Sequence, residues 1–348
     1  MKKVFSILMI TILLTACASS APQAGSPTSA APVSVDPAGG SANPTSAGSE
    51  AGAGVTSNAA ALRTSDVDHT HVALGDGKLS STAQRDYLWS CRSHDNVSPT
   101  TGFPWLNGDG TWDMTKKLTV DGSVTWTSVF SISVQGDQRV FSTNDLASHP
   151  SGNFPINSAD DAYAYDRNPN GISAQSISFQ LPTNPNVAAG PSCVGGEVGI
   201  MLSGVVLFNS IDAEGHDAPA REIQDGCGGH PQMSGLYHYH NLSACLTDTS
   251  TGHSALLGYA LDGFGIFGLY GEDGAELTNA DLDECHGHTH VITWDGQQVN
   301  MFHYHMTNQF PYSVGCYRGT SAVHGPIGGG GGGGQPPAGG SPGGGPPP

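Results

Sequence analysis

Histidine is the residue type whose number and spacing in this sequence most suggest a chemical role. Eleven of the fifteen histidines lie between His216 and His324. Two stretches place histidines one residue apart among aromatic residues, namely Tyr237-His238-Tyr239-His240 and Phe302-His303-Tyr304-His305. Because side chains alternate between the faces of a β-strand, each pair of imidazoles should point to one face, and Tyr237 and Tyr239 to the other. Neutral imidazole is the commonest metal ligand in proteins, so each stretch is a candidate half of a metal site.

A second motif precedes each pair. Residues 225–230 and 283–288 share the pattern Asp-x-Cys-x-Gly-His, and each paired-histidine stretch is followed by a cysteine, Cys245 or Cys316. This order predicts an internal repeat that carries its histidines twice. The predicted metal ligands are His230, His238, His240, His286, His288, His290, His303 and His305.

The Asp295-Gly296 dipeptide between two strand-like runs is a strong hairpin signal. With a two-residue turn there, His288 faces His303, His290 faces Met301 and His286 faces His305. All six side chains then share one face, where opposed Cβ atoms are about 5 Å apart. That distance allows one divalent ion to take ligands from both strands.

The identity of the metal is open at this level. Imidazole suits copper and zinc alike, and the thioether of Met301 on the same face favours copper. Methionine more often fills a gap in a core, however. The alternative to a metal is a polar network in which the histidines bond to tyrosine hydroxyls and buried carbonyls.

Three kinds of function compete. The first is an exported protein that binds copper or zinc. The second is a metal-dependent hydrolase or oxidoreductase, which needs an open coordination position and a nearby general acid or base. Its candidates are Asp225, Asp262, Asp283 and Glu284, although each also suits a turn. The third is a structural or surface-adhesion domain without metal.

The charge balance excludes one class of partner. The formal net charge is −18, and only 12% of the residues are charged. An acidic surface repels nucleic acid and anionic lipid headgroups and attracts cations, so no nucleic-acid partner is expected.

The N-terminus predicts export. Lys2 and Lys3 precede a short apolar run that is too short to span a bilayer, so residues 1–16 read as a signal peptide. The run ends Leu14-Thr15-Ala16-Cys17, which resembles a lipobox, and Cys17 is the predicted lipidation site. The alternative is an ordinary signal cleaved after Ala21. The lipid would anchor the protein to a membrane of the cell envelope on the extracytoplasmic side, the outer membrane where the cell has one.

Composition then divides the rest of the chain. Residues 17–61 are rich in Ala, Gly, Ser, Pro and Thr and predict a flexible, lipid-anchored linker. Residues 325–348 predict a disordered Gly/Pro-rich tail. Residues 62–324 between them predict one large domain.

The cysteines predict disulfides. Six cysteines remain after Cys17, and an even number in an exported protein suggests that all are paired. Six cysteines allow about 15 pairings. The repeat favours one disulfide in each copy, Cys227 with Cys245 and Cys285 with Cys316, which leaves Cys91 with Cys193.

Strand signals dominate the domain and helical periodicity is scarce, so the predicted fold is mainly β, disulfide-stapled and flanked by disordered tails. Residues 118–126 predict a hairpin around Asp121-Gly122, and residues 129–134 lead through a turn into a strand at 139–141. Residues 176–180 and 198–208 predict two further strands, the second of them buried.

Several motifs together resemble one family. They are Tyr237-His238-Tyr239-His240, Gly258–Phe264, Leu282–His290, Phe310–Cys316 and Trp105–Trp112. The chain resembles the YHYH-domain proteins, which are exported bacterial proteins, over about residues 86–320. Two positions depart from the pattern, with Phe302 in place of the first tyrosine in the second copy and Gly265 where proline is expected. The resemblance implies a shared fold and an exported setting, and no agreed activity.

Overall fold

The structure is a computed structural model that describes residues 63–94, 102–323 and 327. These residues belong to a compact unit, Ser57–Pro348, and the other unit of the chain, Met1–Thr56, lies outside the described residues. The predicted signal peptide, Cys17, the linker and the tail except residue 327 therefore lie outside them as well. Within the described ranges, no helix has the length and apolar content that a membrane crossing requires.

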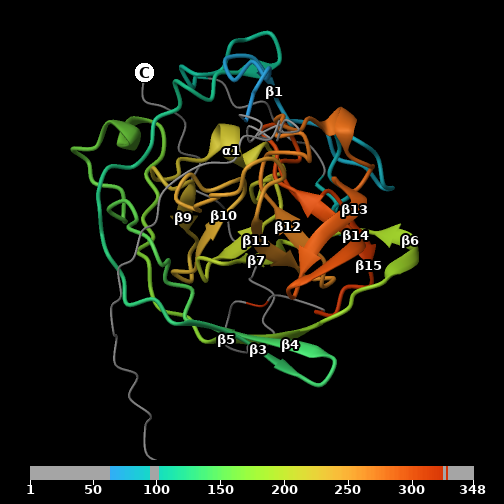
Figure 1. Cartoon of the computed structure of the whole chain (residues 1–348). Helices are drawn as coiled ribbons and strands as arrows, with labels where there is room; N and C mark the ends of the chain where they lie inside the picture. The colour runs from blue at the N-terminus through green and yellow to red at the C-terminus, as the bar shows by residue number, and fades with distance from the viewer. Residues whose placement is uncertain (1–62, 95–101, 324–326, 328–348) are drawn as a thin grey trace, which may run out of the picture. The chain divides into compact units, whose positions relative to one another are not determined.

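The described part of the chain is mainly β, as predicted, and the largest sheet has eight strands (Figure 1). In chain order these strands are β7 (Glu197–Met201), β8 (Val206–Phe208), β9 (Gly229–Pro231), β10 (Tyr237–Tyr239), β11 (Leu256–Ala260), β12 (Gly265–Phe267), β13 (Gly287–Trp294) and β14 (Gln297–His305).

Smaller elements surround this sheet. Three small sheets consist of β1 (Val72–Ala73) with β2 (Thr111–Trp112), of β6 (Val187–Ser192) with β15 (Tyr317–Gly319), and of β3 (Phe130–Gln135), β4 (Gln138–Thr143) and β5 (Ile177–Pro182). The helical segments are single turns, α1 (Ala218–Arg221), η1 (Asp161–Ala164) and η2 (Asn279–Asp281).

The order of the strands reveals that the large sheet is built from two matching halves. The order is β13-β14-β12-β11-β7-β8-β10-β9, with β11 and β7 paired antiparallel at the centre. On each side, an antiparallel hairpin is followed by a strand paired parallel to it and then by an antiparallel edge strand. The halves are therefore related by an approximate twofold rotation between β7 and β11, and the predicted repeat is a structural one.

The hydrogen bonds at the centre follow the same symmetry. Leu202 N–H donates to Leu257 O at 2.8 Å, and Leu261 N–H donates to Val198 O at 3.0 Å. The two donors, Leu202 and Leu261, are 59 positions apart along the chain, and so are the two acceptors, Val198 and Leu257. Each half also turns at a glycine with positive φ, Gly204 (+85°) in the first and Gly263 (+94°) in the second. Glycine tolerates this conformation without steric cost, so both turns are tight enough to return the chain beside the strand it has just left.

The two faces of the large sheet pack differently. The aromatic residues of β10 and β14 lie on one face and are buried in the larger hydrophobic core; they are Tyr237, Tyr239, Phe302 and Tyr304. For Tyr237 and Tyr239 this confirms the prediction from alternation. A second core contains Ile200, Val206 and Trp294 together with Phe141 of the three-stranded sheet. The aromatic residues thus fix β10 and β14 from behind, while the neighbouring histidines point to the opposite face.

The structure corrects one predicted strand and one predicted hairpin. Residues 198–208 do not form one strand but the hairpin β7–β8, because Gly204 N–H donates to Met201 O and closes a turn. The predicted hairpin around Asp121-Gly122 is absent from the described structure. Val120 instead pairs with Asp225, and Val124 pairs with Ser151, so the two arms have partners elsewhere in the chain.

Other local predictions are confirmed. The segment at 129–141 forms the hairpin β3–β4, and the strand predicted at 176–180 is β5. All three disulfides form as predicted, Cys91–Cys193, Cys227–Cys245 and Cys285–Cys316. The last two close equivalent loops in the two halves, which is the pattern expected from the repeat.

Candidate metal sites

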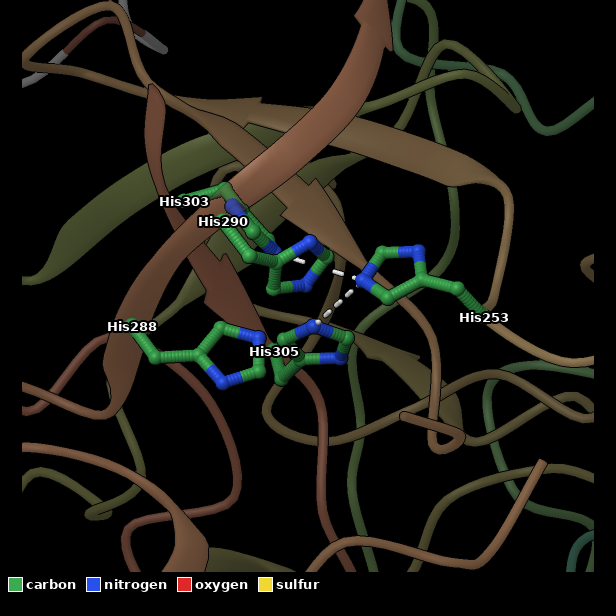
Figure 2. Close-up of side chains that lie close together, drawn as sticks. All are labelled: His253, His288, His290, His303 and His305. Atoms are coloured by element: carbon green, nitrogen blue, oxygen red, sulfur yellow. Dashed lines mark hydrogen bonds between the residues drawn. The ribbon is translucent and has the colours of Figure 1, made fainter. Parts of the chain in front are cut away.

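The predicted histidines form two separate groups rather than one. The first cluster consists of His230, His238 and His240. The second cluster consists of His253, His288, His290, His303 and His305 (Figure 2). In each cluster, one ring nitrogen of every histidine lies within 4.8 Å of the corresponding nitrogens of the others.

The β13–β14 hairpin positions four rings of the second cluster. Asp295 and Gly296 both have positive φ, +47° and +78°, as a two-residue primed turn requires. The register that follows places His288 opposite His303 and His290 opposite Met301, which confirms the predicted pairing. Met301 packs against the hydrophobic core, so its position does not favour copper over zinc.

The protonation of these rings follows from their neighbours. Nδ1 of His303 lies 3.0 Å from Met301 O, and Nδ1 of His305 lies 2.6 Å from Gly268 O. Nδ1 of His253 similarly lies 2.8 Å from Ser254 O. A carbonyl oxygen only accepts, so each Nδ1 carries the hydrogen, and each Nε2 of a neutral ring presents a bare lone pair.

These lone pairs face one another. His253 Nε2 lies 3.3 Å from His303 Nε2 and 3.1 Å from His305 Nε2, the two contacts drawn in Figure 2. The buried Nε2 atoms of His288 and His290 have no hydrogen-bond partner in the described part of the chain. Two acceptors at this distance repel each other unless a cation lies between them. Adjacent nitrogens bound to one ion at about 2.0–2.1 Å are themselves roughly 3 Å apart, so the spacing fits a shared metal.

The rings do not readily take up a proton in place of that cation. Burial, together with the neighbouring His290, lowers the pKa of His253 to about 4, and burial similarly lowers the pKa of His288 to about 4. Burial lowers the pKa of His303 to about 2. These rings are therefore neutral near pH 7, and their lone pairs are available to a metal ion.

His253 was not predicted from the sequence. It lies in the segment before β11, and Figure 2 shows its ring pointing at the four rings of the hairpin. It has no histidine one or two positions away, so neither an alternating pattern nor the repeat marks it. Only the fold brings it to the cluster.

His286 is a predicted ligand that the structure places elsewhere. Its φ is +77°, and it precedes β13, where the strand alternation does not apply. Its buried ring lies 3.0 Å from the Thr307 hydroxyl through Nε2. The expected position opposite His305 on the shared face is therefore wrong for the side chain, although His305 N–H still donates to His286 O at 3.2 Å.

The first cluster is the twofold counterpart of the second. His238 pairs with His230 across β10 and β9, as His303 pairs with His288. Nδ1 of His238 lies 3.3 Å from Leu236 O, and His240 Nδ1 donates to Asn209 O, equivalent to the carbonyl partners of His303 and His305. His238 Nε2 and His240 Nε2 lie 3.1 Å apart. In both halves, the paired histidines thus have the same tautomer, with hydrogen on Nδ1, and their Nε2 atoms point into the cluster.

A carboxylate lies next to two rings of the first cluster. Glu222 follows α1, and its Oε2 lies 3.3 Å from His230 Nε2 and 3.2 Å from His240 Nε2. The sequence did not mark Glu222, which lies outside every repeated motif.

The four acidic residues considered as general acids or bases have other partners. Asp225 accepts the N–H groups of Cys227 and Gly229, and Asp283 accepts those of Cys285 and Gly287, so both shape the turn before the histidine strand. Asp262 accepts the Tyr304 hydroxyl at 2.6 Å. Glu284 pairs with Arg318. These contacts indicate that the four residues stabilise turns and form hydrogen bonds or ion pairs within the fold, rather than transfer protons at a metal.

Comparison with known proteins identifies part of this structure. Residues 178–278 match the family model described as YHYH protein. This match supports the expected resemblance to the YHYH family. The matched segment contains β7–β12 and the first cluster, whereas β13 and β14 lie beyond it. No curated protein and no solved structure matches the chain.

The family match and the three disulfides are consistent with an extracytoplasmic location, because such bonds persist mainly in oxidising compartments. The match is shorter than the stretch from 86 to 320 over which the resemblance was expected.

Proposed function

We propose that the protein binds a transition metal ion, copper or zinc, outside the cytoplasm, and that the second cluster is its principal site. The observation that carries this proposal is the convergence of Nε2 lone pairs from rings whose Nδ1 hydrogens are already donated to backbone carbonyls. Metal-bound histidines in proteins commonly donate their other ring N–H in this manner, which fixes the ring and the tautomer.

A purely structural role for the cluster accounts less well for the geometry. A hydrogen-bonded histidine network needs a hydrogen between each pair of nitrogens, and the contacts of His253 with His303 and His305 supply none when the rings are neutral. Burial of bare nitrogens without partners costs about 1–3 kcal/mol each. An ion bound to all of them removes that cost.

The donor set suits both copper and zinc. The five residues of the second cluster offer only imidazole nitrogen, which both ions accept readily. The thiolates that would favour a soft metal are not available, because the six cysteines outside the N-terminal region are paired in disulfides.

Metal analysis of the purified full-length protein tests the proposal. The protein is exposed to copper or zinc, desalted and measured for bound metal, alongside the double variant His303→Ala, His305→Ala. The matched control is His71→Ala, an exposed histidine outside both clusters. The proposal predicts that the control keeps the wild-type metal content and that the double variant loses one ion per chain. Equal metal content in the wild type and the double variant would refute the second cluster as a site.

We also propose that the protein is anchored to the cell envelope by a lipid on Cys17. The support is the basic start, the short apolar run and the Leu14-Thr15-Ala16-Cys17 sequence. Replacement of Cys17 by Ser should move the protein from the detergent-soluble membrane fraction to the aqueous fraction. Membrane association that is unchanged by Cys17→Ser would contradict the anchor.

A further inference from the structure

The first cluster differs from the second in its donor atoms. The second cluster brings together five imidazoles, whereas the first brings three imidazoles and the Glu222 carboxylate. His230, which pairs with His238 in the sheet, is 4% exposed, and neither of its ring nitrogens has a hydrogen-bond partner in the described chain. Glu222 Oε2 is likewise buried without one.

The contact between Glu222 and His240 calls for a cation. Nδ1 of His240 donates to Asn209 O, so Nε2 of the neutral ring is an acceptor. That nitrogen lies 3.2 Å from Glu222 Oε2, which is also an acceptor. The same nitrogen lies 3.1 Å from Nε2 of His238, a ring whose Nδ1 faces a carbonyl as well. A single metal ion among these atoms satisfies all of them, whereas one proton satisfies one contact.

The first cluster also opens to a pocket. A cavity of about 390 Å³ is lined by His230, His238, His240 and Glu222 together. This volume lies in the range of pockets that hold small molecules, about 300–1,000 Å³. Arg92 and Asp212, which carry opposite charges, line the same cavity. A metal held here would therefore meet a space large enough for a second molecule.

We infer that the first cluster is a second metal centre, formed by His230, His238, His240 and Glu222, that binds a small anion at an open coordination position facing the pocket. The inference rests on the proposed metal-binding function but concerns a different set of residues. Four protein donors fill a tetrahedral set, so the anion would take a fifth position on the side of the ion that faces the pocket, as zinc centres can expand to five ligands. A divalent ion beside neutral imidazoles and one carboxylate keeps a net positive charge, which favours an anion over a neutral molecule.

Cobalt(II) and azide supply the probes. The second cluster is disrupted by His303→Ala, His305→Ala. Because these two residues are buried, a separate variant disrupts it at the half-buried residues instead, with His253→Gln and His290→Gln. Each variant is loaded with cobalt(II), and its visible spectrum is recorded while azide is added. The inference predicts one cobalt ion per chain and a saturable spectral change with azide.

Two further substitutions test whether the cobalt and azide signals come from the first cluster. Glu222→Gln, in the same background, should weaken cobalt binding at least tenfold because it replaces a charged donor with a neutral amide. Glu214→Gln is the matched control, since Glu214 is exposed and does not line the pocket, and it should leave both signals unchanged.

The outcomes separate this inference from the proposed function. Wild-type protein that binds metal, with variants lacking the second cluster that fold and bind none, would overturn the first cluster as a centre and leave the second intact. Bound cobalt that does not respond to azide would overturn the open position. Wild-type protein that binds no metal would overturn both.

Discussion

His286 in the second half of the large sheet occupies the position of Gly228 in the first half. The two residues have φ of +77° and +78°, and their N–H groups donate to the carbonyls of Asp283 and Asp225, respectively. The equivalent position in the first half thus carries no side chain at all. A metal ligand at this turn would have no counterpart in the repeat, which agrees with the bond between His286 and Thr307.

His286→Gly should therefore retain all of the metal that the wild-type protein binds. Glycine adopts the left-handed conformation freely, so the turn and the strand that follows it should form as in the first half. His288→Ala, two positions along on the cluster face, should lower metal affinity at least tenfold. Titration of both variants with zinc against a chromophoric chelator makes the comparison. Weaker binding by His286→Gly than by His288→Ala would show that the ring of His286 reaches the metal.

The metal-free protein should lose stability as the pH falls from about 7 towards 4. The pKa values of His253 and His288 are lowered to about 4, whereas in the unfolded chain they return to about 6.5. The unfolded state therefore takes up protons first, and the free energy of unfolding decreases through this window. Urea unfolding of the chelator-treated protein at several pH values measures the effect.

The control for the pH effect is the double variant His253→Gln, His288→Gln, whose glutamines do not titrate. Its unfolding midpoint should depend less steeply on pH between about 7 and 4 than that of the wild type. Parallel pH profiles for the two proteins would mean that these two rings are not held neutral by the fold.

The hydroxyls behind the two histidine pairs should differ in what they contribute to stability. Tyr304 donates to the buried carboxylate of Asp262 at 2.6 Å. Tyr239 lies 3.1 Å from the hydroxyl of Ser203, the twofold counterpart of Asp262, and also contacts His149 Nε2. Tyr304→Phe leaves a charged acceptor with one donor fewer and should cost about 1.5–3 kcal/mol. Tyr239→Phe removes contacts with a hydroxyl and an imidazole but leaves no buried carboxylate short of a donor, and should cost about 0.5–1.5 kcal/mol.

Urea denaturation of the two tyrosine variants under identical conditions decides this point. Each hydroxyl lies on the face opposite the histidines, so both variants should keep the wild-type metal content. A larger loss of stability in Tyr239→Phe than in Tyr304→Phe would contradict the assignment of the buried carboxylate as the more demanding partner.

The sequence specified the local parts of this structure and missed the parts that depend on distant contacts. The Asp295-Gly296 turn and strict alternation determine the register of His288 with His303, because both act within one hairpin. The disulfides were predictable because the repeat assigns one cysteine pair to each half. Glu222 and His253 reach their clusters from segments outside the repeated motifs, so only tertiary packing brings them there.

His286 illustrates the converse error. Its neighbours in the sequence suggest a ligand, but alternation ends where the strand ends, and the turn at positive φ redirects its side chain. The aligned motifs contained a signal for this, since the equivalent residue is Gly228. A residue that replaces a turn glycine is more readily read as part of the turn than as part of the site.

X-ray absorption spectroscopy at the metal edge tests the central claim most directly. The first cluster is disabled by His238→Ala, His240→Ala, and the remaining ion, copper or zinc, is examined in the second cluster. The account predicts a first shell of nitrogen at about 2.0 Å with the outer-shell scattering of at least four imidazoles. A shell dominated by oxygen, or scattering from two imidazoles or fewer, would show that the ion is not held among His253, His288, His290, His303 and His305.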